Sequence, residues 1–497
     1  MISTRTTVLA LLVVVASRFL YRALCSLFLH PLNIYPGPKL NAVTKLPYIN
    51  QILRGTAHVY IRALHEKYGD IVRITPEELS YSCDAWRDIY GHMTGGRESF
   101  AKDLSFLGPD MIGSNGIMRA QGDTNHARIR KVFSHAFSDR ALKDQAPIFQ
   151  GYVDQLVGNI RKILHEDEKA RIPISDLYNF LTFDIMGDLT FGEPLGLLTD
   201  GKYSTWVASV FGSLQLVIVS RILRWYPWLN GTFQALLPRS IKEKRQRTVS
   251  HTVDCLDKRL ARGETDRPDI WTCVMKHKEE DRLTYPEMQS SASTFMIAGT
   301  ETTATLLSGL TFLLLKHPDV LEKLVREVRS TFSTADDIDI SSLARLEYLN
   351  ACIEEALRIY PPVPIGFPRV VPKHGAFVGG QPVPAGISLA VSPFAAFHSE
   401  KNFHLADQFI PERWLGDPRF GSDKRSVLQP FSYGPRNCLG KNLAYHEMRL
   451  AMTKVLYNFD LVNLCEESQD WMNQKVFGVW QKPKLMVQLK EQNGLWV

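Results

Sequence analysis

The 497-residue chain has only seven cysteines, an odd number, and none of them belongs to a C-x-x-C pair. This pattern excludes the disulfide framework of a small secreted protein and favours reduced thiols in a protein that faces the cytosol. The chain also lacks G-x-S-x-G, H-E-x-x-H and G-x-G-x-x-G motifs and any second Cys or His at zinc-finger spacing. The commonest signatures of hydrolases, metalloproteases, dinucleotide-binding folds and tetrahedral zinc sites are therefore missing.

Acidic residues are absent from the start of the chain: none precedes Glu66, whereas seven Lys and Arg residues do. These account for the net charge of +6, because the rest of the chain has 51 basic and 52 acidic residues. A near-neutral body lacks the basic face that nucleic acid requires, so we expect no nucleic-acid partner. The composition, 45% hydrophobic and 22% charged, is typical of a globular protein with a sizeable core.

The amino terminus contains a long apolar segment, Val8–Leu29, interrupted by two arginines. Its 22 residues are enough for a helix to cross a hydrocarbon layer of about 30 Å, and both arginines can snorkel. We predict a single-pass membrane anchor over residues 1–30, with the body in the cytosol because basic residues follow the segment. A monotopic anchor and a cleaved signal peptide, with Arg5 as n-region and cleavage near Ala16, are the alternatives.

Residues 31–38 are rich in proline, cannot continue a helix and are predicted to form a stiff hinge. No further linker, repeat or low-complexity tract follows, so residues 39–497 are predicted to form one large, mostly helical domain. Within it, the stretch around Trp225, Trp228 and Leu229 is equally compatible with insertion into a membrane surface and with a packed connecting loop.

Two segments of this domain carry the chemistry, and the first is a long helix. A capping box, Thr284 with Glu287, opens a helix predicted to reach Lys316 before a His-Pro pair, a length of about 48 Å. Its middle contains A-G-T-E-T-T, residues 298–303, where Gly299 costs about 1 kcal/mol relative to alanine. We interpret this glycine as the mark of a local bulge or of a groove where a ligand approaches the backbone. The alternative is a core helix that tolerates a glycine.

The second segment is FSYGPRNCLG, residues 431–440, followed by an amphipathic helical pattern. Gly434 and Gly440 allow a positive φ and the close approach of a flat group. Cys438 lies just before the helix, where unpaired N–H groups and the charge of Arg436 favour a thiolate. A phosphate loop is excluded, since five residues separate the glycines instead of four and no Ser or Thr follows the lysine. A lone thiolate in a glycine-bounded loop fits one axial ligand of haem iron.

Together these segments resemble the cytochrome P-450 family, whose haem-binding loop, F-x-x-G-x-R-x-C-x-G, is matched by residues 431–440 at every fixed position. A-G-T-E-T-T is similar to the oxygen-activating segment of the family's central helix, and Glu355 with Arg358 to its E-x-x-R pair. PERW, residues 411–414, is similar to the segment whose Arg413 completes a buried structural network behind the haem loop. The resemblance extends from the proline-rich hinge to the end of the chain. It implies the P-450 fold, mainly α with small β-sheets (α+β), in a single large catalytic domain with a long central helix.

The resemblance also implies roles for individual residues. The cofactor would be haem (iron protoporphyrin IX), with the thiolate of Cys438 as metal ligand and Phe431 packed beside it. Thr302 and Glu301 are implied to deliver protons to dioxygen, although many relatives have Asp in place of this Glu. The remaining implied contacts of the haem come from His126, Arg130, Arg369, Arg436 and Gly440. Substrate-facing positions would be the Phe100–Ile117 loop, Phe295, Ala298, Val363–Phe367 and Phe477, whose apolar character implies a hydrophobic substrate.

The resulting hypothesis is a membrane-anchored haem-thiolate monooxygenase of the endoplasmic reticulum that uses O2 to hydroxylate or otherwise oxidise a hydrophobic small molecule. Its electrons would come from a separate NADPH-cytochrome P-450 reductase, with cytochrome b5 as a second candidate donor. HPLNIYPGPKL, HARIRKVFSHAFS and PPVPIGFPRVV are similar to enzymes of filamentous-fungal secondary metabolism that act on terpenoid or polyketide intermediates. Two alternatives remain, a reductase-independent haem-thiolate peroxygenase or isomerase and a non-catalytic haem sensor. The Glu301–Thr302 pair argues against the first, and the apolar pocket residues argue against the second.

Overall fold

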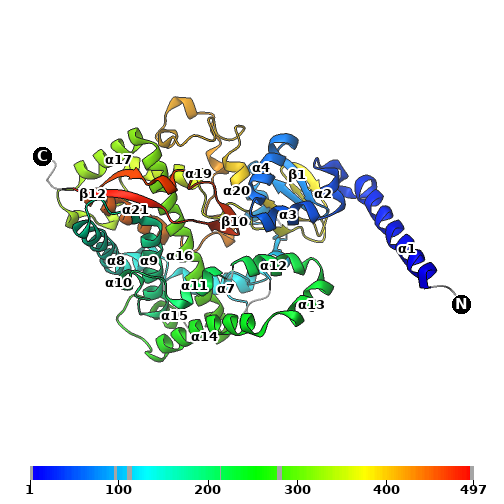
Figure 1. Ribbon diagram of the computed structural model, residues 1–497, viewed down its shortest axis with the longest axis horizontal. Coiled ribbons are helices and arrows are strands. Elements are labelled where there is room, and N and C mark those ends of the chain that lie inside the picture. Colours follow the sequence, from blue (N-terminus) through cyan, green and yellow to red (C-terminus); the bar gives the residue numbers. More distant parts are fainter. Residues whose placement is uncertain (1–3, 94–97, 109–114, 213, 277–281, 493–497) are drawn as a thin grey trace.

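Helices make up most of the molecule, a computed structural model that describes residues 4–93, 98–108, 115–212, 214–276 and 282–492 (Figure 1). The longer helices of the body are α4 (Ala57–Tyr68), α7 (Asp123–Ser134), α8 (Asp139–Glu166), α9 (Ile174–Phe191), α12 (Leu214–Arg224), α14 (Arg239–Ala261), α16 (Tyr285–Lys316), α17 (Pro318–Thr331), α19 (Glu347–Ile359) and α21 (Lys441–Asn458). The shorter ones are α2 (Lys39–Val43), α3 (Leu46–Arg54), α5 (Trp86–Tyr90), α6 (Leu104–Leu107), α10 (Leu197–Asp200), α11 (Thr205–Gly212), α13 (Pro227–Leu236), α15 (Ile270–Met275), α18 (Ile340–Leu343) and α20 (Pro393–Phe397). The predicted fold class, mainly α with small sheets, is confirmed.

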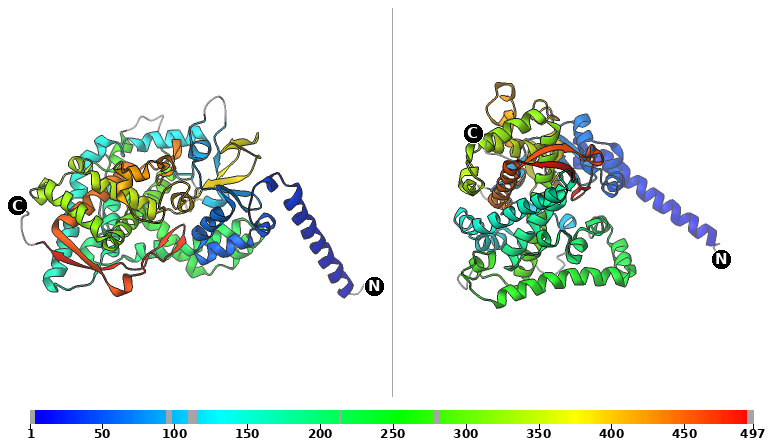
Figure 2. Two further views of the ribbon diagram at one scale, coloured as in Figure 1. Left: turned by 90° about the horizontal axis from the view of Figure 1, so that it is seen from above. Right: turned by 60° about the vertical axis from the view of Figure 1, so that its left-hand side comes forward.

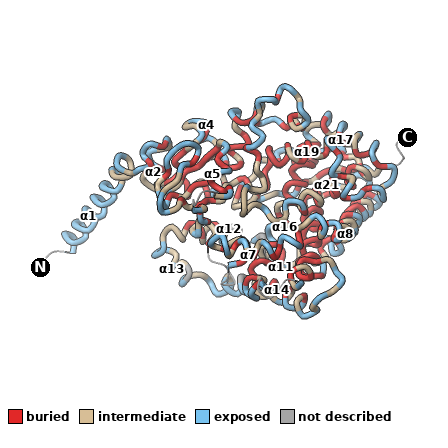
Figure 3. Tube along the Cα trace, turned by 180° about the vertical axis from the view of Figure 1, so that it is seen from behind, coloured by how far each residue is buried: buried red, intermediate tan, exposed pale blue. Residues whose placement is uncertain are grey.

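The amino-terminal helix projects away from the body. α1 (Thr4–Leu24) continues through a π-helical turn, so that residues 4–29 form one helix, whose most apolar 18-residue stretch has a mean hydropathy of 2.0 and no buried residue. Figure 2 shows it on the far side of the molecule from the carboxyl terminus, and Figure 3 shows α1 exposed along most of its length. Its length and composition suit a membrane span.

The predicted hinge, residues 31–38, is packed on the body. Leu32 is completely buried, and the hydroxyl of Tyr35 donates to the carbonyl oxygen of Pro382 at 2.8 Å. A Cβ on Gly37 would meet the carbonyl oxygen of Arg73 at 2.5 Å, so only glycine permits this approach. The direction in which the chain leaves α1 is therefore set by contacts with Arg73 and Pro382 of the body. The boundaries predicted for the anchor (1–30), the hinge (31–38) and the large domain (39–497) stay a prediction.

The largest sheet has the strand order β1-β2-β8-β5-β3. Its strands are β1 (Ile71–Thr75), β2 (Glu78–Tyr81), β8 (Ser388–Val391), β5 (Arg369–Val370) and β3 (Ala101–Lys102); β2 and β8 are parallel and the other pairs antiparallel. The smaller sheets are β4 (Ile172–Pro173), β12 (Met486–Glu491) and β9 (Phe459–Leu464); β10 (Lys475–Phe477) and β11 (Val479–Gln481); and β6 (Ala376–Val378) and β7 (Gln381–Val383). The large sheet thus joins residues near 101 to residues near 369.

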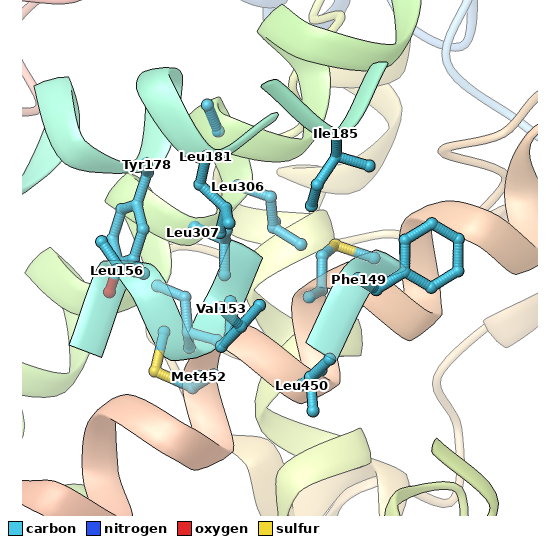
Figure 4. Packing of buried hydrophobic residues seen from close by; sticks show 14 of the residues in the cluster. Phe149, Val153, Leu156, Tyr178, Leu181, Ile185, Leu306, Leu307, Leu450 and Met452 are labelled. Carbon is cyan, nitrogen blue, oxygen red and sulfur yellow. The ribbon is translucent and has the colours of Figure 1, made fainter. Parts of the chain in front are cut away.

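The core lies where α8, α9, α16 and α21 meet. Figure 4 shows their interlocking side chains: Phe149, Val153 and Leu156 of α8, Tyr178, Leu181 and Ile185 of α9, Leu306 and Leu307 of α16, and Leu450 and Met452 of α21. Residues 303–314 of α16 are all buried, because this half of the helix is surrounded on every side.

The long central helix was predicted correctly. α16 spans Tyr285–Lys316, and the capping box of Thr284 and Glu287 is present. The predicted bulge at Gly299 is wrong, since α16 is an uninterrupted α-helix at this position, whereas the predicted groove for a ligand stays a prediction. A Cβ on Gly299 would meet Met186 Sδ at 2.7 Å, so the glycine allows α9 to pack closely against α16.

Candidate functional site

The cysteine loop is shaped by its hydrogen bonds and by one glycine. Cys438 N donates to the carbonyl oxygen of Phe431 at 2.9 Å, which closes the loop. Gly434 has φ 73°, and a Cβ there would collide with the carbonyl oxygen of Tyr90, so the predicted positive φ is confirmed. The same prediction was wrong for Gly440, which has φ −87° and is the residue that precedes α21.

The surroundings of the Cys438 thiol act on its pKa in both directions. The residue is exposed, yet protein atoms surround it closely enough for burial to raise the pKa of the thiol. A backbone hydrogen bond from Gly440 and the charges of Arg130 and Lys441 act in the opposite direction. Burial prevails, so this environment alone does not favour a thiolate. A metal ion that binds the sulfur would displace the proton.

Arg436 does not act on this thiol, in contrast to the expectation from its spacing. Its guanidinium donates to the carbonyl oxygen of Ala120 at 2.8 Å and forms an ion pair with Asp123 at 3.2 Å. Arg130 is the arginine that contacts the cysteine loop, since it donates to the carbonyl oxygen of Asn437 at 2.7 Å and to its Oδ1 at 2.6 Å. The helix that carries Arg130, α7, is thereby attached to the loop.

A cluster of basic groups gathers beside this loop, and we call it the cation cluster; its members are Lys102, His126, Arg130, Arg369 and Arg436. Burial and the neighbouring positive charges lower the pKa of Lys102 to about 6, of His126 to about 3 and of Arg369 to about 10. Across the described residues, no ion pair joins Lys102, Arg130 or Arg369 to a carboxylate. In its fully charged form such a cluster requires an anionic ligand, and the two carboxylates of haem meet that requirement.

Lys102 was missed by the sequence analysis. It lies directly opposite Arg369 in the antiparallel pairing of β3 with β5, and its ammonium donates to the carbonyl oxygen of Met118 at 2.6 Å. Like charges facing each other across a sheet are destabilising, so this register points to an anion between them. No local pattern marks Lys102, because a contact between residues 102 and 369 depends on strand pairing.

The A-G-T-E-T-T segment presents three different environments. Ala298 is exposed in the middle of α16, and Thr302 is half-buried, with its hydroxyl donating to the carbonyl oxygen of Ala298 at 2.7 Å. Glu301 is buried and forms an ion pair with Lys482. The described residues contain no hydrogen bond between Glu301 and Thr302, so the structure does not join the two predicted partners directly.

The predicted substrate-facing residues are only partly brought together. Phe295 is buried and packs edge-on against Phe133, with ring centroids 4.8 Å apart. Val363, Phe367 and Phe477 are half-buried. Residues 109–114 of the Phe100–Ile117 loop lie outside the described residues. Beyond them, Ile117 N donates to Ser291 Oγ of α16 at 3.3 Å. The contact of these positions with substrate stays a prediction.

A buried network of charges joins α19 to residues 410–423. Glu355 Oε1 accepts from Arg358 Nη2 at 2.7 Å and from Arg413 Nε at 2.9 Å, and all three side chains are at most 1% exposed. Both ion pairs were predicted from the sequence. Two further members were not: Asp423 pairs with Arg413 at 2.5 Å, and Trp414 Nε1 donates to Glu355 Oε2 at 2.9 Å.

Comparison with known proteins agrees with this geometry. The family model described as Cytochrome P450 matches residues 36–489. The cytochrome P450 monooxygenase efuB of Hormonema carpetanum is 47% identical over 464 residues, which are 93% of this chain and 92% of the relative. The cytochrome P450 monooxygenase FUM2 of Gibberella moniliformis is 44% identical over 464 residues, 93% of this chain and 98% of the relative. Averantin hydroxylase of Dothistroma septosporum is 41% identical over 468 residues, 93% of this chain and 87% of the relative.

Proposed function

Because this chain belongs to the cytochrome P450 family and is a monooxygenase of that family, we propose that Cys438 supplies the thiolate ligand of a haem. The observation that carries the proposal is the cation cluster beside an exposed cysteine whose loop Arg130 contacts. Haem, when bound, supplies the iron at which dioxygen is activated. Metal binding would release the proton of Cys438, whose pKa is raised by burial, and the nearby charge of Arg130 favours the anion.

The cation cluster would bind the two carboxylates of the haem. Lys102 and Arg369 approach from paired strands, His126 and Arg130 lie one turn apart on α7, and Arg436 comes from the cysteine loop. Because these groups come from separate elements, the carboxylates would link the sheet, α7 and the loop. Each charge-assisted hydrogen bond of this kind is worth about 1.5–3 kcal/mol.

In the reaction, Thr302 and Glu301 would hold and pass protons. Glu301 is a buried carboxylate on the same helix as Thr302, whose hydroxyl donates to Ala298 in this structure. Rotation of that hydroxyl would let it donate toward the exposed surface at Ala298, where small molecules have access to the helix. The half-buried apolar residues Val363 and Phe367 would provide part of the contact with a hydrophobic substrate.

The substrate class is proposed from the relatives. Several are fungal monooxygenases, and one is named averantin hydroxylase. We therefore propose hydroxylation of a hydrophobic intermediate of fungal secondary metabolism, of terpenoid or polyketide type. Electrons would come from a separate NADPH-cytochrome P450 reductase, with cytochrome b5 as an additional donor. Omission of the reductase should stop NADPH-dependent turnover, whereas full activity with peroxide alone would favour a peroxygenase.

The amino-terminal helix would anchor the protein in the endoplasmic reticulum, with the catalytic domain in the cytosol. The length and the exposure of residues 4–29 support this proposed anchor. Trp228 and Leu229 of α13 are exposed, whereas Trp225 packs against Tyr48. Asn230 begins an N-G-T sequence, which would receive a sugar only in the lumen. Membrane fractions should contain the protein with Asn230 unmodified, and a sugar there would contradict the proposed orientation.

The direct test is the spectrum of the reduced carbon monoxide complex, whose band at about 450 nm gives the family its name. C438S should remove this band, because an alcohol does not replace the thiolate as ligand. C273S is the matched control, since Cys273 is a half-buried free cysteine on α15 and should leave the band unchanged. Retention of the band in C438S would exclude this residue as the ligand.

A further inference from the structure

Lys482 brings an ammonium group into the interior beside the acid of α16. Its side chain is 5% exposed and that of Glu301 is 8% exposed, and Lys482 Nζ forms an ion pair with Glu301 Oε1. The same ammonium donates to Thr305 Oγ1, one turn further along the helix, at 2.5 Å. A lysine is seldom buried to this degree unless it is paired. Loss of either partner would leave an uncompensated charge inside the protein.

The backbone around Lys482 is anchored on both sides. Trp480 is buried on one side and its Nε1 donates to the carbonyl oxygen of Pro361 at 2.7 Å. Leu485 is buried on the other side and its N–H donates to Ser175 Oγ at 2.9 Å. Lys482 therefore reaches Glu301 from a fixed position, as a group that orients a functional side chain must.

The two carboxylate oxygens of Glu301 differ in their hydrogen bonds. Oε1 accepts from Lys482, whereas Oε2 is buried and has no hydrogen-bond partner among the described residues. Tyr203 and Tyr360 lie near: burial raises the pKa of both phenols, and the charge of Glu301 adds to the effect. Neither phenol supplies positive charge. Lys482 is thus the cation that balances Glu301 within the part of the chain that the structure describes.

We propose that Lys482 is a positioning residue that keeps Glu301 ionised and holds it on the Thr305 side of α16, away from Thr302. The proposal rests on the role proposed above for Glu301 in proton delivery. It adds that Glu301 must leave Lys482 before it can serve Thr302. Without the ammonium, a buried carboxylate next to a hydroxyl would take up a proton at neutral pH.

The experiment is infrared difference spectroscopy of the full-length, haem-loaded protein at pH 7. The signal is the carbonyl stretching band of a protonated carboxyl group, assigned to Glu301 by its loss when E301Q is added to the same background. The wild-type protein should show no such band, and K482M should show one carboxyl equivalent. K482R, which keeps the charge, should restore the wild-type spectrum. K484M is the matched control, because Lys484 is 68% exposed and pairs with Asp176 instead.

Two results would overturn the proposal: a protonated Glu301 in the wild-type protein, or an ionised Glu301 in K482M. K482Q supplies the same comparison if K482M does not fold, since its amide is polar and uncharged. The carbon monoxide spectrum distinguishes failure of the proposal for Lys482 from failure of the proposed function. If K482M has a normal band near 450 nm and the same infrared spectrum as the wild-type protein, only the role of Lys482 is refuted. A retained band in C438S would refute the thiolate ligand and leave the Lys482–Glu301 pair standing as a charge pair.

Discussion

The substitution E355Q tests the buried charge network of α19. The carboxylate of Glu355 accepts hydrogen bonds from Arg358 Nε and Nη2, Arg413 Nε, Trp414 Nε1 and the N–H of Ile410, at 2.7–3.0 Å. Glutamine has nearly the same shape but only one acceptor oxygen. If that oxygen takes the place of Oε1, the amide nitrogen faces the N–H groups of Arg358 and Trp414 on the other side. No orientation of the amide satisfies all five donors.

The expected cost follows from the charges. Glu355 and Asp423 balance Arg358 and Arg413, and all four side chains are at most 1% exposed. E355Q leaves one buried positive charge without compensation, a change that destabilises proteins by about 3–5 kcal/mol. Since typical folding free energies are about 5–15 kcal/mol, this loss removes a large part of the stability. We therefore expect the network to act on folding.

Urea unfolding of the full-length protein, followed by tryptophan fluorescence, measures this cost. The control is R326A, which removes an ion pair with Glu322 whose two side chains are 72% and 71% exposed, and should cost less than about 1 kcal/mol. The reasoning is refuted if E355Q lowers the free energy of unfolding no more than R326A does. A loss confined to turnover, with normal unfolding, would be equally inconsistent with a structural network.

Two further predictions concern the cation cluster and buried histidines. K102M should weaken haem retention by about one charge-assisted hydrogen bond, 1.5–3 kcal/mol, and should stabilise the haem-free protein most below pH 6, where Lys102, whose pKa is lowered to about 6, is a cation facing Arg369. Haem transfer to apomyoglobin and urea unfolding of the haem-free protein measure the two effects, and an unchanged transfer rate would contradict the assignment. Burial lowers the pKa of His58 and of His65 to about 4, below the value of about 6.5 in an unfolded chain. The unfolded state therefore binds more protons below pH 6.5, so the stability of the folded state should fall as the pH decreases from about 6.5 to about 4. Urea titrations across this range measure the slope, which should be smaller in the double variant H58Q/H65Q; an equal slope would exclude these two groups.

The local features of the sequence predicted local structure well. The capping box of Thr284 and Glu287 and the His-Pro pair after Lys316 define the two ends of α16 correctly, because helix termini depend on groups within a few residues. The positive φ of Gly434 and the pairing of Glu355 with Arg358 were predictable for the same reason.

The failures involve residues whose neighbours are distant in the chain. Gly299 is explained by Met186 of α9, and Lys102 by its place opposite Arg369. Arg436 was expected to act on Cys438 two positions away, but its guanidinium turns toward Ala120 and Asp123. Spacing along the chain limits which groups can meet, whereas the direction of a long side chain depends on the tertiary surroundings.

The sequence alone determined the cysteine loop, the long central helix and the apolar amino-terminal segment, since each depends on residues that are neighbours in the chain. Only the tertiary structure decided which charges face one another: the cation cluster, the two additional members of the Glu355 network and the ion pair of Lys482 with Glu301. The physical reason is that Coulomb energy and desolvation depend on distance and burial in space. Residues 301 and 482 share neither a helix nor a strand, and they meet because β11 and the turn after it pack against α16.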